Sequence, residues 1–388
     1  MSQGNPGHLG VDLYSHAPGH SLITGDGSKM RTYAGTSDTS AAYVSTKGAR
    51  TYMSQCGTVV GCLLIALLPS LLFPQTSVWK DPSPHQVRFV TVDKDVKLEV
   101  LDWGGSGTPI VLLAGGGDTA HVFDDFAPKL QSVTHLHVYA ITRRGFGASS
   151  YEATNDPADR LGEDVLSVIE SLKLDRPILA GHSIAGAEMS WIANNHADRV
   201  AGLVYLEAGY SYAFDDGHGA SVMDMMALHA PQPPPPAPRD LADFGALDNY
   251  DKRVNGFRSP ESELRQERQL TPTGAVGEYR NLPGGPLLMQ LLTHPNRYSH
   301  IPVPSLFIFG NPHTLGTWVD HSTDAAVRDA AKAYSTALAT LTERQEHAVK
   351  SGLPTAHVIT ISRANHYIYF SNEHEVLRDM RAFISTLH

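Results

Sequence analysis

One short stretch, from Pro177 to Gly186, constrains the fold of this chain more than any other. It opens with an apolar run, residues 177–180, which predicts a buried strand, and it closes with an amphipathic run, residues 185–196, which predicts a helix. Between the two runs, Ser183 is bracketed by small residues. A strained turn that presents a serine between a strand and a helix is called a nucleophile elbow, and its neighbours must be small because strand and helix approach closely.

The usual elbow pattern is Gly-x-Ser-x-Gly, and this chain departs from it at the last position. Ala185 stands there, and Gly186 follows one residue later. Alanine is small enough for the turn, so we interpret the stretch as a variant elbow. The alternative is a Gly-His-Ser triplet in an ordinary loop.

Composition narrows the class of protein. Of 388 residues, 41% are hydrophobic and 18% charged, which is enough to bury a large core in a single α/β domain. The net charge of −10 and the lack of a basic patch exclude nucleic acid as an expected partner. The 20 histidines show no metal-ligand spacing, and both cysteines, Cys56 and Cys62, lie outside the predicted folded domain.

The N-terminal part has a different character. Residues 1–52 are rich in Gly, Ser, Thr and Tyr, which predicts a disordered extension. Residues 53–80 contain an uncharged, apolar segment at 57–73, preceded by Lys47 and Arg50. Its length is typical of a signal-peptide core or a short membrane anchor, so we expect export to the periplasm or medium, or membrane association through residues 57–73. A buried core helix is the alternative.

The folded domain, residues 81–388, shows alternating strands and helices. Residues 86–92 and 96–103 have the period of two expected of a hairpin at a sheet edge. Strands alternating with helices predict an α/β fold, a mostly parallel sheet flanked by helices. The expected buried strands are 109–114, 135–142, 177–180, 200–207, 303–310 and 356–361, and the expected helices are 122–130, 159–174, 185–196, 323–351 and 372–387.

This alternation breaks between about residues 210 and 300. A structureless loop of that length is improbable in one domain, so we expect an inserted helical cap. A methionine cluster that includes Met223 and Met226 belongs either to the core of the cap or to the wall of an apolar pocket. Together with Tyr210 and with Gly117 of an earlier glycine run, these methionines are the candidate substrate-binding residues.

From about residue 85 to its end, the chain resembles α/β-hydrolase-fold proteins. The resemblance rests on five features: the Ser183 elbow, the cap-sized insertion, Leu113-Ala-Gly-Gly-Gly117 after the third strand, Arg144-Gly-Phe-Gly147 after the fourth and Ala364-Asn-His366 after the last. The chain departs from that family at two places. The usual His-Gly of the oxyanion loop is Ala114-Gly115, and the usual Asp after the seventh strand is missing from residues 310–313.

The resemblance implies a catalytic triad. A serine hydroxyl is a weak nucleophile that needs an adjacent base, and His366 is the expected base for Ser183. Glu207 ends the sixth strand and would accept the other imidazole proton. The competing carboxylate is Asp320, ten residues past Gly310. We prefer Glu207 because neighbouring parallel strands end at the same edge of the sheet.

The glycine run and the elbow imply an oxyanion hole. The backbone N–H groups of Gly116 and Ile184 would donate to the developing negative charge, with Gly117 as the close alternative to Gly116. We interpret His182, beside the nucleophile, as a packing residue. The Arg143–Arg144 pair is expected to support the fold.

A serine at the elbow argues against the dehalogenases and epoxide hydrolases of this fold, which place an aspartate there. The sequence therefore predicts a serine esterase that cleaves a small-molecule carboxylic ester through an acyl-enzyme on Ser183, without cofactor or metal. Two alternatives stay open: an aminopeptidase or amidase of the same fold, and a ligand-binding protein with little turnover.

Overall fold

The computed structural model describes residues 79–152, 157–293 and 298–387. The extension at 1–52 and the apolar segment at 57–73 lie outside the described residues, so disorder, export and anchoring stay predictions. Within the described part of the chain, no helix is long and apolar enough to cross a membrane. All elements below belong to one structural unit, and they lie in its part from Pro82 onward.

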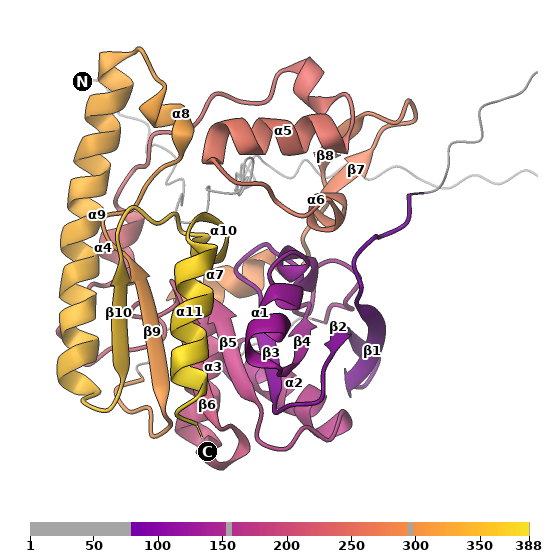
Figure 1. The fold of residues 1–388 in the computed structure, drawn as a ribbon, viewed down its shortest axis with the longest axis vertical. Helices are drawn as coiled ribbons and strands as arrows, with labels where there is room; N and C mark the ends of the chain where they lie inside the picture. Colours follow the sequence, from indigo (N-terminus) through magenta and orange to yellow (C-terminus); the bar gives the residue numbers. More distant parts are fainter. Residues whose placement is uncertain (1–78, 153–156, 294–297, 388) are drawn as a thin grey trace, which may run out of the picture. The chain divides into compact units, whose positions relative to one another are not determined.

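An eight-stranded sheet forms the centre of this unit, in the order β1-β2-β4-β3-β5-β6-β9-β10 (Figure 1). β1 and β2 form an antiparallel hairpin at one edge, β2 pairs antiparallel with β4, and the other pairings are parallel. The predicted edge hairpin and mostly parallel sheet are thus confirmed. The strands are β1 Gln86–Asp93, β2 Val96–Gly104, β3 Pro109–Leu113, β4 His137–Ile141, β5 Ile178–His182, β6 Gly202–Leu206, β9 Ser305–Gly310 and β10 His357–Ile361.

Helices cover both faces of the sheet because its central strands are apolar on both sides. In β3, Ile110 and Leu112 join one hydrophobic core, and Val111 and Leu113 join the other. The first core is completed by η1 Ala120–Phe123, α1 Ala127–Thr134, α10 Ile368–Ser371 and α11 Glu373–Ile384. The second is completed by α2 Pro157–Ser171, α3 Ala185–Asn195 and α9 Ala325–Gly352. A short η2, Ala197–Arg199, precedes β6.

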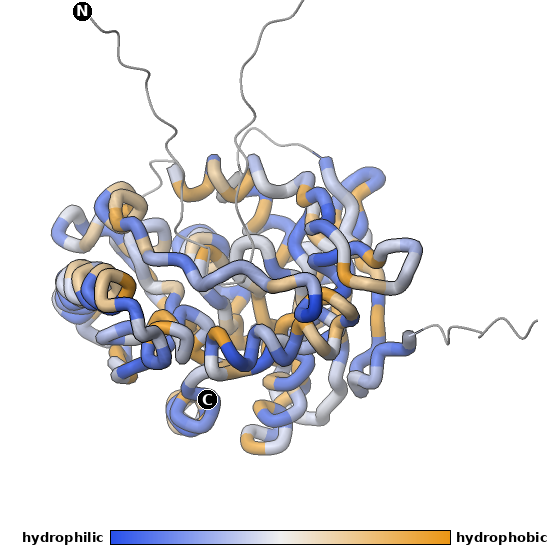
Figure 2. Tube along the Cα trace, turned by 90° about the horizontal axis from the view of Figure 1, so that it is seen from above, coloured by the Kyte–Doolittle hydropathy of each residue, from blue (hydrophilic) through white to orange (hydrophobic). Residues whose placement is uncertain are grey.

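The chain between β6 and β9 forms the insertion. It consists of α4 Val222–Met226, η3 Pro238–Leu241, α5 Phe244–Asn255, α6 Glu261–Glu267, β7 Arg268–Leu270, β8 Val276–Tyr279 and α7 Gly285–Thr293. Figure 1 shows α5, α6 and the β7–β8 hairpin beyond the carboxyl ends of the main strands. Seen from above, hydrophobic and hydrophilic stretches alternate along the Cα trace (Figure 2).

Two features of the insertion differ from a purely helical cap. It contains the β7–β8 hairpin, and only part of it has its own core, made by Phe244, Leu247, Tyr250, Val254, Leu264 and Val276. Helix α7 instead buries Leu287 and Leu291 in the main core, next to α2. The apolar face of α7 therefore packs in the core of the sheet domain.

The elbow explains why a glycine stands at position 186. A Cβ atom added to Gly186 would collide with the carbonyl oxygen of Ala208, in the loop that follows β6. Ala185 is fully buried and accommodated. The close approach that the elbow requires is therefore provided one residue later than in the usual pattern.

We predict that Gly186→Ala lowers the free energy of unfolding by about 1–3 kcal/mol, because the added methyl group overpacks the contact between α3 and the β6 loop. Urea unfolding followed by circular dichroism measures the change. Gly245→Ala is the matched control, because Gly245 is exposed on α5. A Cβ atom added there would lie 3.3 Å from an Asp243 carboxylate oxygen. There alanine's better helix propensity should cause no loss. Equal stability of Gly186→Ala and the wild type would contradict the packing argument.

Candidate active site

The serine of the elbow meets a histidine from the far end of the sequence. Ser183 follows β5 with a φ of 53°, a backbone conformation that non-glycine residues rarely adopt. His366 lies in the loop between β10 and α10. Its Nε2 atom is 3.0 Å from the Ser183 Oγ atom, so the imidazole can accept the hydroxyl proton.

Glu207 lies behind this histidine. It is the first residue after β6, is fully buried and also has a positive φ, 50°. Its Oε2 atom is 3.4 Å from His366 Nδ1. The structure therefore brings together the three residues that the sequence suggested. Asp320, the competing carboxylate, ends α8 (Thr317–Asp320) with its side chain 56% exposed, and it lies 3.9 Å from Arg363.

A second histidine, whose role no sequence pattern predicts, contacts Glu207. His313 lies in the loop after β9, where the family usually carries its acid, and its Nε2 atom is 2.6 Å from Glu207 Oε2. Gly310 donates its backbone N–H to Glu207 Oε1, and the Tyr210 hydroxyl donates to Oε2 at 3.1 Å. Burial alone would raise the pKa of Glu207, but the charge and hydrogen bond of His313, and then those of His366, outweigh it and hold the pKa well below its usual range.

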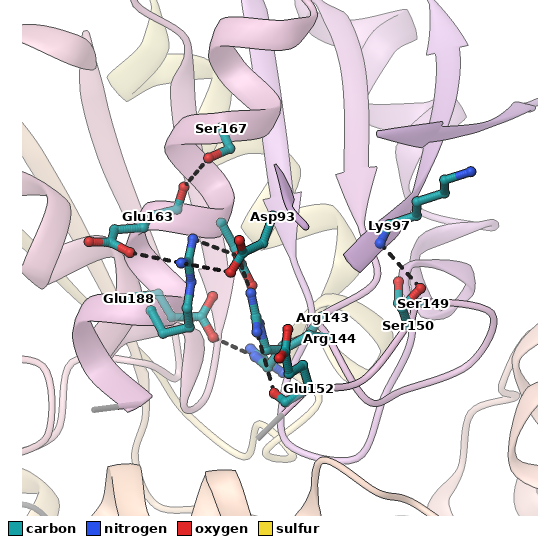
Figure 3. A network of polar contacts seen from close by, with 12 residues as sticks. Asp93, Lys97, Arg143, Arg144, Ser149, Ser150, Glu152, Glu163, Ser167 and Glu188 are labelled. Carbon is teal, nitrogen blue, oxygen red and sulfur yellow. Dashed lines mark hydrogen bonds and ion pairs between the residues drawn. The ribbon is translucent and has the colours of Figure 1, made fainter. Parts of the chain in front are cut away.

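The glycine run lies between β3 and η1, and Arg143 fixes its start by hydrogen bonds. The guanidinium donates to the carbonyl oxygens of Ala114 and Gly115, at 2.8 and 3.0 Å. It also pairs with Glu188 on α3 (Figure 3). Because these carbonyl groups are bonded to Arg143, the loop between β3 and η1 is held in one conformation.

The two proposed oxyanion donors belong to neighbouring strands. Gly116 follows β3, and Ile184 follows β5, which pairs with β3. Ile184 is the N-cap residue of α3, and N–H groups at a helix N-terminus lack intrahelical acceptors. Gly117 has a φ of 93°, which favours glycine, and it turns the loop toward η1.

His182 and Arg144 connect parts of the site to the fold. His182 is buried, and its Nε2–H donates to the carbonyl oxygen of His366 at 3.0 Å. Burial, followed by the nearby His366, lowers the pKa of His182 well below its ordinary value, so the ring is a neutral donor. Arg144 makes two hydrogen bonds to Asp164, at 2.5 and 2.6 Å. The arginine pair supports the fold, as predicted.

A cavity of about 50 Å³ opens beside the serine. Helix α4 contributes Val222 and Met225, and α9 contributes Tyr334 and Leu338. The full lining is Ser183, Glu207, Tyr210, Tyr212, Val222, Met225, His313, Tyr334, Leu338 and His366.

This lining changes part of the predicted substrate site. Tyr210 lines the cavity, but Met223, Met226 and Gly117 are not among the lining residues, and Met223 is 64% exposed. The methionine that lines the cavity is Met225, which is buried. Which methionine faces inward depends on how α4 lies against α9, a contact that the sequence does not specify.

Two further groups of described residues bring metal-ligating atoms within 4.8 Å of one another, and neither includes Ser183, His366 or Glu207. One contains His85, His121 and Asp124, and the other is Asp118, Glu263 and Glu267. Protein groups already bond to both: Asp124 accepts from both histidines, Thr119 donates to Glu263, and Tyr367 donates to Asp118. The second group thereby joins α6 of the insertion to the glycine loop and to the His366 loop.

The geometry agrees with a comparison to known proteins. A model of the alpha/beta hydrolase family matches residues 110–379, which is more than half of the chain. The chain belongs to the alpha/beta hydrolase family. Among its relatives are a pyrethroid hydrolase from Sphingobium wenxiniae, 33% identical over 104 residues, and a carbendazim hydrolyzing esterase from a Nocardioides species, 32% identical over 122 residues.

These matches cover only part of each protein. The pyrethroid hydrolase match spans 26% of this alpha/beta hydrolase and 36% of the relative, and the esterase match spans 31% and 48%. The solved structure of E-2-(acetamidomethylene)succinate hydrolase is similar over 78% of this chain and 99% of its own, with a TM-score of 0.53 and 19% identity. At that identity the likeness shows the fold.

We predict that Glu207→Gln destabilises this hydrolase in a pH-dependent way. The pKa of Glu207 is lower in the folded protein than its ordinary value of 4.5, so the stabilisation is complete above pH 4.5 and is lost as the pH falls toward the folded value. At pH 7 the variant should lose about 3 kcal/mol of unfolding free energy, because two histidines lose their charged partner.

Denaturant unfolding between pH 3 and pH 8 measures this loss, and the difference between variant and wild type should shrink below pH 4.5. Asp320→Asn, which removes an exposed carboxylate, is the control and should differ little from the wild type at any pH. A difference for Glu207→Gln that stays constant down to pH 3 would contradict the assigned charge.

Proposed function

We propose that this protein is a serine hydrolase that cleaves carboxylic esters through an acyl-enzyme on Ser183, with His366 as base and Glu207 as acid. The observation that carries the proposal is the 3.0 Å approach of His366 Nε2 to Ser183 Oγ, with the buried Glu207 carboxylate on the other side of the ring. A nucleophile, a base and a group that orients the base are the parts required for acyl transfer.

In the first half of the reaction, Ser183 Oγ attacks the ester carbonyl carbon while His366 Nε2 takes the hydroxyl proton. The N–H groups of Ile184 and Gly116 stabilise the oxyanion of the tetrahedral intermediate. The imidazolium then gives its proton to the departing alcohol oxygen, and the acyl group stays on Ser183. In the second half, water attacks the acyl carbon while His366 takes a proton from it. The imidazolium then returns the proton to Ser183 Oγ, and the carboxylic acid product leaves.

Glu207 orients His366 by accepting its Nδ1 proton, and it stabilises the imidazolium that forms in both halves. Asp320 has no such contact, because its exposed side chain lies near Arg363. The names of the relatives, a pyrethroid hydrolase and an esterase, support an ester as the substrate class. The apolar side chains of Val222, Met225 and Leu338 favour a hydrophobic acyl group in the cavity.

We predict that Ser183→Ala lowers kcat on p-nitrophenyl esters by roughly a million-fold, because the nucleophile is lost while the fold is kept. The matched control is Ser167→Ala on α2, a half-buried residue whose hydroxyl donates to the Glu163 carbonyl oxygen. It should turn over like the wild type.

Amide analogues and a fluorophosphonate probe extend the same test. Turnover of anilides in preference to esters would favour an amidase. Slow labelling of the wild type without turnover would favour a ligand-binding protein, because only an activated serine reacts quickly. Full activity in a folded Ser183→Ala protein would overturn the acyl-enzyme.

A second prediction concerns the cavity wall. Met225→Ala should enlarge the cavity and raise kcat/KM for hexanoate over acetate p-nitrophenyl esters by roughly tenfold, since each buried methylene is worth about 0.8 kcal/mol. Met223→Ala is the matched control on the same helix, because the Met223 side chain is exposed. Its chain-length preference should equal that of the wild type. An equal effect of both substitutions would show that α4 does not form the acyl wall.

A further inference from the structure

We propose that His313 and Tyr210 are positioning residues that share the Glu207 carboxylate with His366 and so keep His366 active as a base at lower pH. The proposal deepens the function proposed above and rests on it. His313 and Tyr210 would act through Glu207 and not on the substrate.

The first observation is that one carboxylate oxygen serves three donors. Glu207 Oε2 lies 2.6 Å from His313 Nε2, 3.1 Å from the Tyr210 hydroxyl and 3.4 Å from His366 Nδ1. A carboxylate offers about four lone-pair sites over its two oxygens, so three donors on one oxygen compete. The His366 contact is the longest of the three. The other oxygen, Oε1, accepts the backbone N–H of Gly310.

The second observation is that, among the described residues, the His313 side chain has its hydrogen bond with Glu207. Its Nε2 atom makes the hydrogen bond, and its buried Nδ1 atom has no hydrogen-bond partner among the described residues. The ring also lines the cavity beside Ser183. If His313 only filled space, it would have no reason to form a short hydrogen bond with Glu207, the carboxylate that orients the base.

The third observation concerns the charges around this carboxylate. Glu207 is fully buried, and none of its bonded partners is a Lys or Arg of the described residues. The titratable groups that face it come from five elements: Tyr210 after β6, His313 after β9, His366 after β10, Tyr334 on α9 and His182 at the end of β5. Burial and then Glu207 raise the pKa of Tyr210 well above its ordinary value, so Tyr210 donates as a neutral hydroxyl.

The consequence for catalysis follows from competition. Each extra donor takes up negative charge on Oε2 and weakens the stabilisation of the His366 imidazolium by Glu207. A less stabilised imidazolium loses its proton at a lower pH, and only the neutral ring can accept the proton of Ser183. Removing a competing donor should therefore move the acid limb of the pH profile upward.

The experiment compares four single variants with the wild type. His313→Phe keeps a ring without a donor, His313→Gln keeps a donor without a ring, and Tyr210→Phe removes only a hydroxyl. His137→Gln is the matched control, since His137 Nε2 is 2.7 Å from Asp102 Oδ1 at the amino end of β4, the opposite end of the sheet. The measurement is the pH dependence of kcat/KM for p-nitrophenyl acetate and of the rate of fluorophosphonate labelling.

We expect His313→Phe to raise the midpoint of the acid limb by about one pH unit, with activity recovered at alkaline pH. Tyr210→Phe should shift it in the same direction by less. His313→Gln should also shift it by less than His313→Phe, because the amide keeps the hydrogen bond without the charge, and His137→Gln should stay near the wild type. An unmoved acid limb in the two Phe variants, a shift to lower pH, or an equal loss at every pH would overturn the proposal. If His313→Phe does not fold, Tyr210→Phe decides.

A measurement without turnover separates this inference from the proposed function. In the Ser183→Ala background, the pH dependence of the His366 ring signal in ¹³C-histidine NMR reports the same competition, with the signal assigned by His366→Gln. A higher titration midpoint of this signal in His313→Phe supports the sharing even if the protein cleaves no ester. In that case only the proposed function fails. If the titration midpoint does not change while the wild type cleaves esters, the sharing of Glu207 is overturned and the proposed function stands.

Discussion

The site depends on one fully buried carboxylate. A charge without water must be met by donors on every side, or it is too costly to keep. Glu207 has four such donors: three come from the loops after β6, β9 and β10, and the fourth is the N–H of Gly310, the last residue of β9. Those loops can converge only because the parallel strands end at the same edge. The position of His366 therefore depends on the strand order, because the donors that satisfy the Glu207 charge lie at the ends of neighbouring strands.

The same edge is held from two other directions. Arg143 bonds the carbonyl oxygens of the glycine run and pairs with α3, so the loop after β3 and the elbow helix are fixed together. Glu263 on α6 accepts from the backbone N–H of Thr119, which joins the insertion to the end of that loop. The insertion therefore contributes to the rigidity of the site and, through α4, to the wall of its cavity.

Much of this could be predicted from sequence because it is local or periodic. The apolar runs of β5 and β6 and the small residues around Ser183 are all found in short stretches. The residues that line the cavity do not follow from such local patterns. Met223 was chosen from the same cluster as Met225, yet Met223 faces solvent, and Tyr334 and Leu338 come from a helix more than a hundred residues away in sequence.

The sequence by itself determined the fold class and the elbow with its serine, because strand period and turn sterics are local properties of the chain. The pairing of Ser183 with His366 was implied by the resemblance to α/β-hydrolase-fold proteins. Only the tertiary structure decided between Glu207 and Asp320 as the carboxylate beside His366, brought His313 to that carboxylate and turned Met225 inward. Each of these depends on which surfaces of distant segments meet when the core packs, and no local pattern encodes the distance between two loops.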